Sequence, residues 1–180
     1  MSENNLSKTL EIKDLSIEFR TRNRTVYAVN HLDMEIKKGQ TLGLVGETGA
    51  GKTTLMRVLT TVLAPTSGKV LLDGTLYCEA NYEKIQKKIG YLPQEIDLYP
   101  SLTVRECLEY MGDLAGIEKR ESKKRIDYYL EKTSLADHQK KKMRQLSGGM
   151  KRRVGLVQAL LHEPDFLIVD EPTTGLDPEE

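Results

Sequence analysis

The sequence has few of the residues that stabilise extracellular proteins or anchor proteins in membranes. It contains no tryptophan and two cysteines, Cys78 and Cys107, in 180 residues. Their spacing fits no metal site, and we expect two free thiols in a reducing cytoplasm. No apolar run approaches the ~20 residues that a membrane-spanning helix needs. Residues 1–5 lack the basic and apolar regions of a secretory signal peptide. The composition therefore argues against a disulfide-stabilised scaffold and an integral membrane protein.

The sequence also lacks an excess of charge of either sign. Lysine and arginine together number 27, as do aspartate and glutamate, so the net charge is zero. Because a dedicated nucleic-acid binder usually has a strong basic excess, we expect no nucleic-acid partner. The hydrophobic content of 38% and the charged content of 30% are typical of a soluble globular protein. At this length we expect one domain with a sizeable core.

The most informative stretch is residues 46–53, with the sequence GETGAGKT. It fits the phosphate-loop pattern of Gly, four variable residues and Gly-Lys-Ser/Thr. Residues 41–45 predict a short buried strand before it. After it, apolar residues recur at the spacing of a helix: Leu55, Met56, Leu59, Val62 and Leu63. A strand, a glycine loop and a helix are the context that the motif requires, whereas the alternative is a glycine turn with a solvated lysine.

The residues of this loop suit the binding of phosphate groups. Glycines let the main chain approach an anion closely, and the following helix presents its positive N-terminal end. Lys52 would contact the β- and γ-phosphates, and the Thr53 hydroxyl would ligate Mg²⁺. The predicted nucleotide-binding residues of the loop are Gly46, Glu47, Thr48, Gly49, Ala50, Gly51, Lys52, Thr53 and Thr54.

The remaining pattern predicts an α/β fold. Residues 10–19 and 26–36 alternate as two antiparallel strands, with a slip near Lys13 and Asp14 that is typical of a bulge. Short strands are expected at residues 69–72, 89–92 and 166–169, the last of them buried on both faces. Helices are expected at about residues 79–88, 104–115, 119–132 and 148–162, the second beginning with a capping box of Thr103 and Glu106.

Polar residues at the ends of two of these strands are candidates for catalysis. Gln94 follows the strand at 89–92, and its amide oxygen could ligate Mg²⁺ or orient water. Asp170 and Glu171 follow the strand at 166–169. Asp170 would hold the water shell of the metal ion, and Glu171 would polarise an attacking water. A loop glutamine and solvated acids at a strand end are the alternative interpretation.

Two further features suggest ligand contacts. Ser147 is a natural N-cap, and Gly148 and Gly149 leave the start of the next helix open, which makes a second anion site. The alternative is an ordinary capped helix. Phe19 lies in the strand at 10–19, where an exposed aromatic ring beside a phosphate site could stack on adenine; a strand phenylalanine is more often part of the core.

Together these motifs closely resemble the nucleotide-binding domain of ABC-type ATPases, over nearly the whole chain. Residues 46–53 are similar to Walker A, residues 166–171 to Walker B and residues 146–150 to the signature motif. Gln94 falls at the Q-loop position, residues 175–177 match the D-loop, and Phe19 falls at the adenine-stacking aromatic of the A-loop. The signature, in order between the two Walker motifs, is highly specific.

The resemblance implies a fold. We expect a P-loop NTPase core with a mainly parallel sheet, an N-terminal antiparallel β subdomain and an α-helical subdomain. Residues 1–180 would form a single ATPase domain, with residues 1–94 and 146–180 in the α/β core and residues 95–145 as the helical insertion. Helices that simply cover the sheet are the alternative for this insertion.

The resemblance also implies a mechanism. Two such domains would pair head to tail, with ATP between Walker A of one copy and Ser147, Gly148 and Gly149 of the other. Glu171 would be the catalytic base, and Thr53, Gln94 and Asp170 would hold Mg²⁺. The partner would be an integral membrane permease, which places the domain peripherally on the cytoplasmic face of the cell membrane.

Two departures from the family pattern refine this reading. Met150 replaces the usual glutamine of the signature and is followed by Lys-Arg-Arg, which resembles the ABC-2 type exporters and favours export. The sequence stops at Glu180, whereas the family has a further part of the sheet with a switch histidine. All three histidines precede Walker B: His31, His138 and His162. We therefore expect a partial domain with an incomplete sheet. Alternative functions are a soluble ABC ATPase acting on DNA or ribosomes, and a nucleotide binder without turnover.

Overall fold

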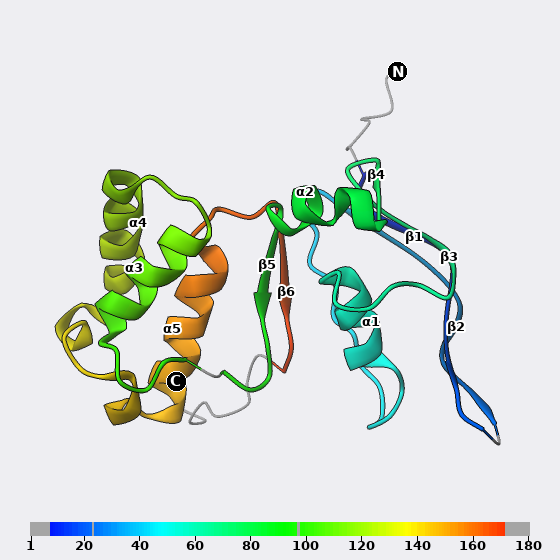
Figure 1. Ribbon diagram of the computed structural model, residues 1–180, viewed down its shortest axis with the longest axis horizontal. Helices are drawn as coiled ribbons and strands as arrows, with labels where there is room; N and C mark the ends of the chain where they lie inside the picture. The colour runs from blue at the N-terminus through cyan, green and yellow to red at the C-terminus, as the bar shows by residue number, and fades with distance from the viewer. Residues whose placement is uncertain (1–7, 23, 97, 172–180) are drawn as a thin grey trace. The chain divides into compact units, whose positions relative to one another are not determined.

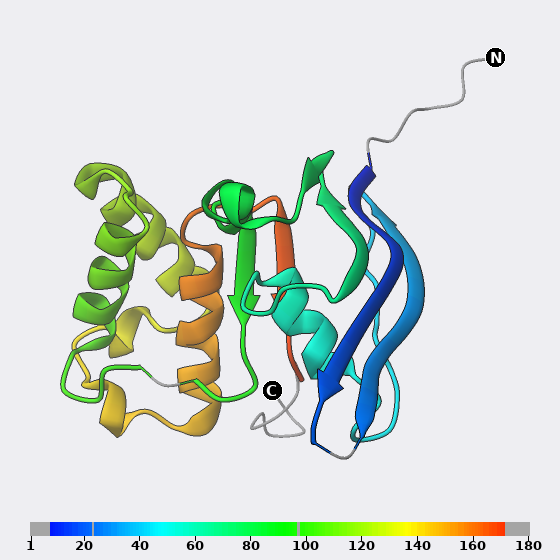
Figure 2. The same ribbon diagram turned by 45° about the vertical axis from the view of Figure 1, so that its right-hand side comes forward.

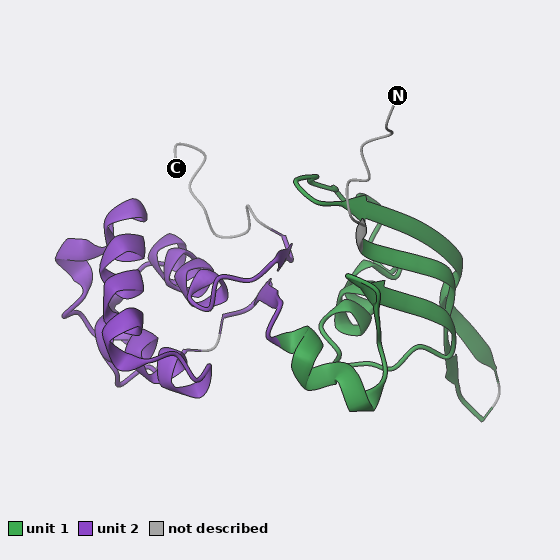
Figure 3. Ribbon diagram, turned by 90° about the horizontal axis from the view of Figure 1, so that it is seen from above, with its two compact units in different colours: residues 1–86 green, residues 87–180 purple. Residues whose placement is uncertain are grey.

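A computed structural model describes residues 8–22, 24–96 and 98–171 (Figure 1). The chain forms two compact units, Met1–Gln86 and Lys87–Glu180, and each has a sheet of its own (Figure 3). Within the described ranges, no helix has the length and apolar character needed to cross a membrane.

The first unit is built on a four-stranded antiparallel sheet with the order β2-β1-β3-β4. Its strands are β1 (Lys8–Arg20), β2 (Thr25–Lys37), β3 (Ser67–Leu72) and β4 (Thr75–Leu76). The register of β1 against β2 shifts between Ile12 and Leu15, and Asp14 has a φ of 50° there. The predicted bulge is therefore confirmed. The extra residue keeps Ile12 and Leu15, three positions apart, both buried in the core.

Two helices accompany this sheet, α1 (Lys52–Leu59) and α2 (Tyr82–Gln86), the latter preceded by a 3₁₀ turn at Glu79–Asn81. Helix α1 lies beside the sheet (Figure 2). It ends earlier than predicted, because Thr61 takes a left-handed conformation with a φ of 62°. The N–H groups of Val62 and Leu63 both donate back to the Arg57 carbonyl, and Val62 is 74% exposed. Val62 and Leu63, which continue the helical spacing of apolar residues in the sequence, therefore lie beyond the end of the helix.

Residues 41–45 do not form the predicted buried strand. They have no regular secondary structure, and Val45 is 98% exposed. An apolar run becomes a buried strand only where neighbouring strands pair its main-chain groups. Among the described residues no strand pairs with these five. The sheet of this unit consists of β1 to β4, with β2 and β4 at its edges, and residues 41–45 pair with neither edge. The segment is instead the exposed approach to the phosphate loop.

The second unit contains a parallel pair of strands, β5 (Ile89–Leu92) and β6 (Phe166–Val169), both with the predicted bounds. Its helices are α3 (Val104–Leu114), α4 (Lys119–Lys132) and α5 (Gly148–Leu160). Gly90 of β5 lies so near α5 that an added Cβ would be 2.3 Å from the Ala159 carbonyl oxygen. The prediction that β6 is buried on both faces is wrong: Leu167 is 38% exposed, because within the described residues β6 pairs with β5 alone.

Helices α3, α4 and α5 enclose a core of their own, and α5 lies between the α3–α4 pair and the sheet (Figures 1 and 2). The core consists of Val104, Cys107, Leu108, Ile126, Leu130, Leu135, Met143, Leu146, Val154, Val157 and Leu161. Leu114 and Ala115, at the end of α3, are exposed and lie outside this core. Cys78 and Cys107 are free thiols as predicted, and burial raises the pKa of Cys107.

The predicted helical subdomain at residues 95–145 stays a proposal.

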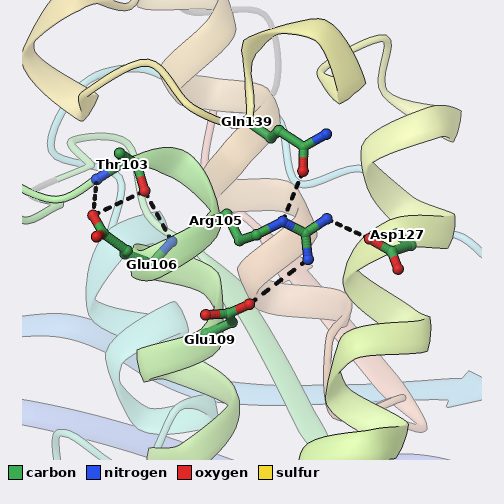
Figure 4. A network of polar contacts seen from close by, with 6 residues as sticks. All are labelled: Thr103, Arg105, Glu106, Glu109, Asp127 and Gln139. Atoms are coloured by element: carbon green, nitrogen blue, oxygen red, sulfur yellow. Dashed lines mark hydrogen bonds and ion pairs between the residues drawn. The ribbon is translucent and has the colours of Figure 1, made fainter.

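Arg105 joins α3 to α4 and to the segment that follows α4 through polar contacts (Figure 4). Its Nε donates to Gln139 Oε1 at 2.7 Å, and its Nη atoms pair with Glu109 on α3 at 3.7 Å and with Asp127 on α4. One side chain of α3 therefore contacts α4 and the segment that follows it. The planar guanidinium suits this task because its donors point in several fixed directions.

The predicted capping box at the start of α3 is confirmed (Figure 4). Thr103 Oγ1 accepts a hydrogen bond from the Glu106 N–H at 3.2 Å, and Glu106 Oε2 accepts one from the Thr103 N–H at 2.8 Å. The Thr103 hydroxyl also donates to this carboxylate. These bonds favour the ionised carboxylate, so they lower the pKa of Glu106 below its ordinary value.

We expect Glu106→Gln to make stability less dependent on pH in the acidic range. The folded-state pKa of Glu106 is lower than the unfolded one, so its contribution is fully present above the unfolded pKa and is lost as pH falls through the folded pKa. Urea unfolding at pH 7 should show the wild type to be more stable than the variant, with the gap shrinking as the pH falls toward 3. An equal gap at both ends of this range would contradict the prediction.

Candidate functional site

The phosphate loop of the first unit closes around the ammonium group of Lys52. The Nζ atom donates to the carbonyl oxygens of Gly46 at 2.7 Å and of Glu47 at 2.9 Å. The Ala50 N–H donates to the same Glu47 carbonyl at 3.1 Å. The loop therefore holds the Lys52 ammonium group against its own carbonyl oxygens.

Two glycines of the loop are in the left-handed region, Gly49 with a φ of 86° and Gly51 with a φ of 85°. A Cβ added at Gly51 would lie 2.0 Å from the carbonyl oxygen of Ala28 in β2. Around Gly49 such an atom would meet nothing within 4 Å. Gly51 is therefore needed both for its backbone angle and for the close approach of the loop to the sheet.

Helix α1 starts directly after this loop with its N-terminal end open. No side chain caps it, and its first turn contains no acidic residue. The first N–H groups of a helix have no acceptor within the helix, and the partial positive charge there favours an anion. Thr53 is exposed in this first turn, followed by the partly buried Thr54. The loop, Lys52 and the start of α1 together have the chemistry of a phosphate-binding site.

Phe19 lies near the end of β1, opposite Val26 of β2 in the strand register. Its side chain is 44% exposed, so it is not simply a core residue. That exposure leaves a ring available for stacking, while the predicted contact with adenine stays a prediction.

In the second unit, the two parallel strands bring Gln94 and Glu171 together. Leu92 pairs with Val169, and the Asp170 N–H donates to the Leu92 carbonyl at 2.9 Å, which extends the ladder to the strand ends. Gln94 Nε2 then donates to Glu171 Oε2 at 2.7 Å. The amide oxygen of Gln94 is a separate acceptor. The carboxyl ends of the strands thus gather the polar residues that the sequence proposed there.

Asp170 and Glu171 differ in their surroundings. Asp170 is buried, whereas Glu171 is exposed and has a φ of 47°. A left-handed conformation costs a residue with a Cβ about 1–2 kcal/mol. Such conformations persist where surrounding contacts hold them, and they are frequent at functional sites.

The contacts that hold this edge come from Arg152, a residue that the sequence did not single out as functional. Its side chain is on α5 and the residue is 5% exposed. One Nη donates to the carbonyl oxygens of Pro93 and, at 3.1 Å, Gln94. The other donates to those of Asp170 and, at 2.8 Å, Glu171. In sequence Arg152 stands in a run of three basic residues, where no pattern distinguishes the buried one from its partly exposed neighbours.

Helix α5 begins at the glycine pair as predicted, with Ser147 as its N-cap. Ser147 Oγ accepts a hydrogen bond from the Met150 N–H at 3.2 Å, and the first turn contains no acidic residue. Ser147 and Gly148 are exposed, while Gly149 is buried. The serine hydroxyl keeps its own proton as a donor. This helix start therefore has the features of a second anion site.

The predicted magnesium ligands include no ready-made cluster of carboxylates. In the part of the chain that the structure describes, no group of three His, Cys, Asp or Glu residues could hold a metal ion. Mg²⁺ bound with a nucleotide takes most ligands from phosphates and water, and few from the protein. Thr53 in the first unit, and Gln94 and Asp170 in the second, each have a side-chain oxygen of the kind that Mg²⁺ takes as a ligand. The predicted D-loop, residues 175–177, lies outside the described residues.

Comparison with known proteins identifies the family. The family model described as ABC transporter matches residues 29–174. The uncharacterized ABC transporter ATP-binding protein YhaQ of Bacillus subtilis is 43% identical over 151 residues, covering 84% of this chain and 49% of the relative. The methionine import ATP-binding protein MetN of Corynebacterium diphtheriae is 37% identical over 173 residues, covering 94% and 51%. The chain thus spans about half the length of these relatives.

A solved structure gives the same answer for the fold. The ATP-binding cassette MJ0796, a dimer in a post-hydrolysis state bound to ADP and phosphate, superposes with a TM-score of 0.84 at 28% identity. The match covers 94% of this chain and 77% of that one. Sequence and structure therefore agree: the chain has the α/β fold of P-loop NTPases and belongs to the ABC transporter family, among its ATP-binding proteins.

Proposed function

We propose that this chain binds MgATP and hydrolyses it to drive transport by a partner membrane protein. The observation that carries the proposal is the phosphate loop. A lysine ammonium sits at its centre, bonded to the Gly46 and Glu47 carbonyls, next to the open start of α1. An anion that contacts this ammonium and the free N–H groups gains both a charge-assisted bond and the field of the helix.

The residues have separate roles in this proposal. Residues 46–54 bind the phosphates, Phe19 stacks on adenine, and Thr53, Gln94 and Asp170 ligate Mg²⁺. Glu171 accepts a proton from the attacking water, and the Gln94 amide, 2.7 Å away, orients its carboxylate. The bound metal ion would neutralise charge that develops on the phosphates.

We also propose that two copies, or this chain and a related one, act as a head-to-tail dimer. Ser147, Gly148 and Gly149 would then contact the nucleotide that the other copy holds. The start of α5 supports this role, because its first turn contains no acidic residue and it lies far in the sequence from the phosphate loop. The similar cassette MJ0796 is itself dimeric.

The direction of transport is a finer proposal. Met150 followed by Lys-Arg-Arg resembles exporters, and on that pattern we propose export through an integral membrane permease at the cytoplasmic face of the membrane. The relative MetN is named for import, so membership of the family does not by itself set the direction.

A thermal shift experiment on the full-length protein tests nucleotide binding. Ligand at about 100 times its Kd adds roughly 2.7 kcal/mol of stability, so MgATP should raise the Tm of the wild type by several degrees. Lys52→Ala should abolish most of this shift, because the ammonium group is lost. Lys38→Ala, which removes an exposed lysine of the same unit, should leave the shift intact. No shift in the wild type, or an equal one in Lys52→Ala, would refute the proposal.

A further inference from the structure

Arg152 joins the helix that starts at the signature motif to both strand ends of the second unit. It is the fifth residue of α5, which begins at Gly148 with Ser147 as N-cap. Its guanidinium bonds to four main-chain carbonyl oxygens, two after β5 and two after β6. The neighbours Lys151 and Arg153 are more exposed, so only the middle residue of the basic run is fully buried.

The geometry of these bonds bears on the two polar side chains at the strand ends. The carbonyl oxygens of Gln94 and Glu171 accept hydrogen bonds from the Arg152 guanidinium at 3.1 and 2.8 Å. The two side chains are bonded to each other, with Gln94 Nε2 donating to Glu171 Oε2 at 2.7 Å. The Glu171 backbone is left-handed, so the direction of its carboxylate depends on contacts that hold this conformation. A planar guanidinium with fixed donor directions can hold several carbonyls in one arrangement, which an ammonium group cannot.

We propose that Arg152 is a positioning residue for ATP hydrolysis: it holds the main chain of Gln94 and Glu171 so that the carboxylate of Glu171 can act as the base. The inference rests on the hydrolytic function proposed above. Because Arg152 and Ser147 both lie in the first turns of α5, Arg152 also makes the placement of Glu171 depend on where this helix start lies. Contact of the signature motif with nucleotide would thereby act on the base through one side chain.

Steady-state ATP hydrolysis by the full-length protein tests this role through the variants Arg152→Met and Arg152→Lys. Methionine keeps much of the length of the side chain but has no hydrogen-bond donor. Lysine keeps the positive charge, but its donors are fewer and have no fixed directions. We expect Arg152→Met to reduce kcat by roughly 10- to 100-fold, the range for residues that orient the ligands of a metal site. KM should change less than about two-fold, because the phosphate loop is untouched. Arg152→Lys should recover part of kcat.

Arg125→Met is the matched control. Arg125 also bonds to a main-chain carbonyl beside α5, that of Leu161 at 3.1 Å, but at the opposite end of the helix. It pairs with Glu121 at 3.1 Å and Glu163 at 2.9 Å. Losing it should loosen the packing of α5 and lower the Tm, while kcat of the folded protein stays within about two-fold of the wild type.

The outcomes separate the two proposals. If the wild type does not hydrolyse ATP, the proposed function and this inference both fail. If it does, wild-type kcat in both Arg152 variants overturns the inference alone, as does an equal loss of kcat in Arg125→Met. Should Arg152→Met not fold, Arg152→Lys decides: a lower kcat at an unchanged Tm supports positioning, and a wild-type kcat overturns it.

Discussion

Replacing Glu171 with glutamine is expected to reduce kcat for ATP hydrolysis by roughly 10²- to 10⁴-fold, the contribution of a positioned general base. The amide has the shape of the carboxylate, and its oxygen can still accept the hydrogen bond that Gln94 Nε2 donates at 2.7 Å. It cannot take a proton from water. MgATP should therefore still raise the Tm of the variant, while steady-state turnover falls, since binding and proton transfer depend on different residues.

Glu163 offers a matched control for this substitution. Like Glu171 it is an exposed glutamate of the second unit with a left-handed backbone, with φ values of 53° and 47°. It lies before β6 and not after it, and its carboxylate pairs with Arg125. Glu163→Gln should therefore leave kcat within about two-fold of the wild type. Wild-type turnover in Glu171→Gln, or an equal loss in Glu163→Gln, would show that Glu171 is not the base.

The second large effect is expected on stability, from Gly51→Ala. A residue with a Cβ pays about 1–2 kcal/mol at the φ of 85° found there. The new atom would also lie 2.0 Å from the Ala28 carbonyl oxygen, so loop or strand must move, which costs a further 1–3 kcal/mol or so. We expect a total loss of about 2–5 kcal/mol in the free energy of unfolding, measured by urea denaturation without nucleotide.

Gly49→Ala separates the two causes. Gly49 has nearly the same φ, 86°, but a Cβ there would meet nothing within 4 Å. Its loss should be limited to the backbone cost of about 1–2 kcal/mol. Equal losses in the two variants would mean that the close approach of Gly51 to Ala28 has no energetic weight.

The elements that the sequence predicts correctly are those that are encoded locally. The bounds of β5, β6 and α4 follow from periodicity and turn residues, and the capping box of Thr103 and Glu106 is made by residues three positions apart. The bulge near Asp14 was visible because one extra residue interrupts an alternating pattern.

The incorrect predictions for residues 41–45 and for Phe166–Val169 share one physical origin. Residues 41–45 and Phe166–Val169 are both apolar runs, and such runs are buried on both faces only inside a sheet that has strands on both sides and layers packed on both faces. Among the described residues, the first run has no partner strand and the second has one. The early end of α1 at Leu59 has a different origin, since the helical spacing of apolar residues continues past the point where Thr61 turns left-handed.

In the candidate site too, local features are predictable from the sequence, and contacts between distant segments are not. By itself, the sequence determined the phosphate loop, the N-cap at Ser147 and the family, because each depends on residue types at short, fixed spacing. Which side chains meet depends on the packing of distant segments. The bond between Gln94 and Glu171 spans 77 positions of the chain and exists because β5 and β6 are parallel and in register. The burial of Arg152 follows from how α5 packs on these strands, a property that no local pattern of charges contains.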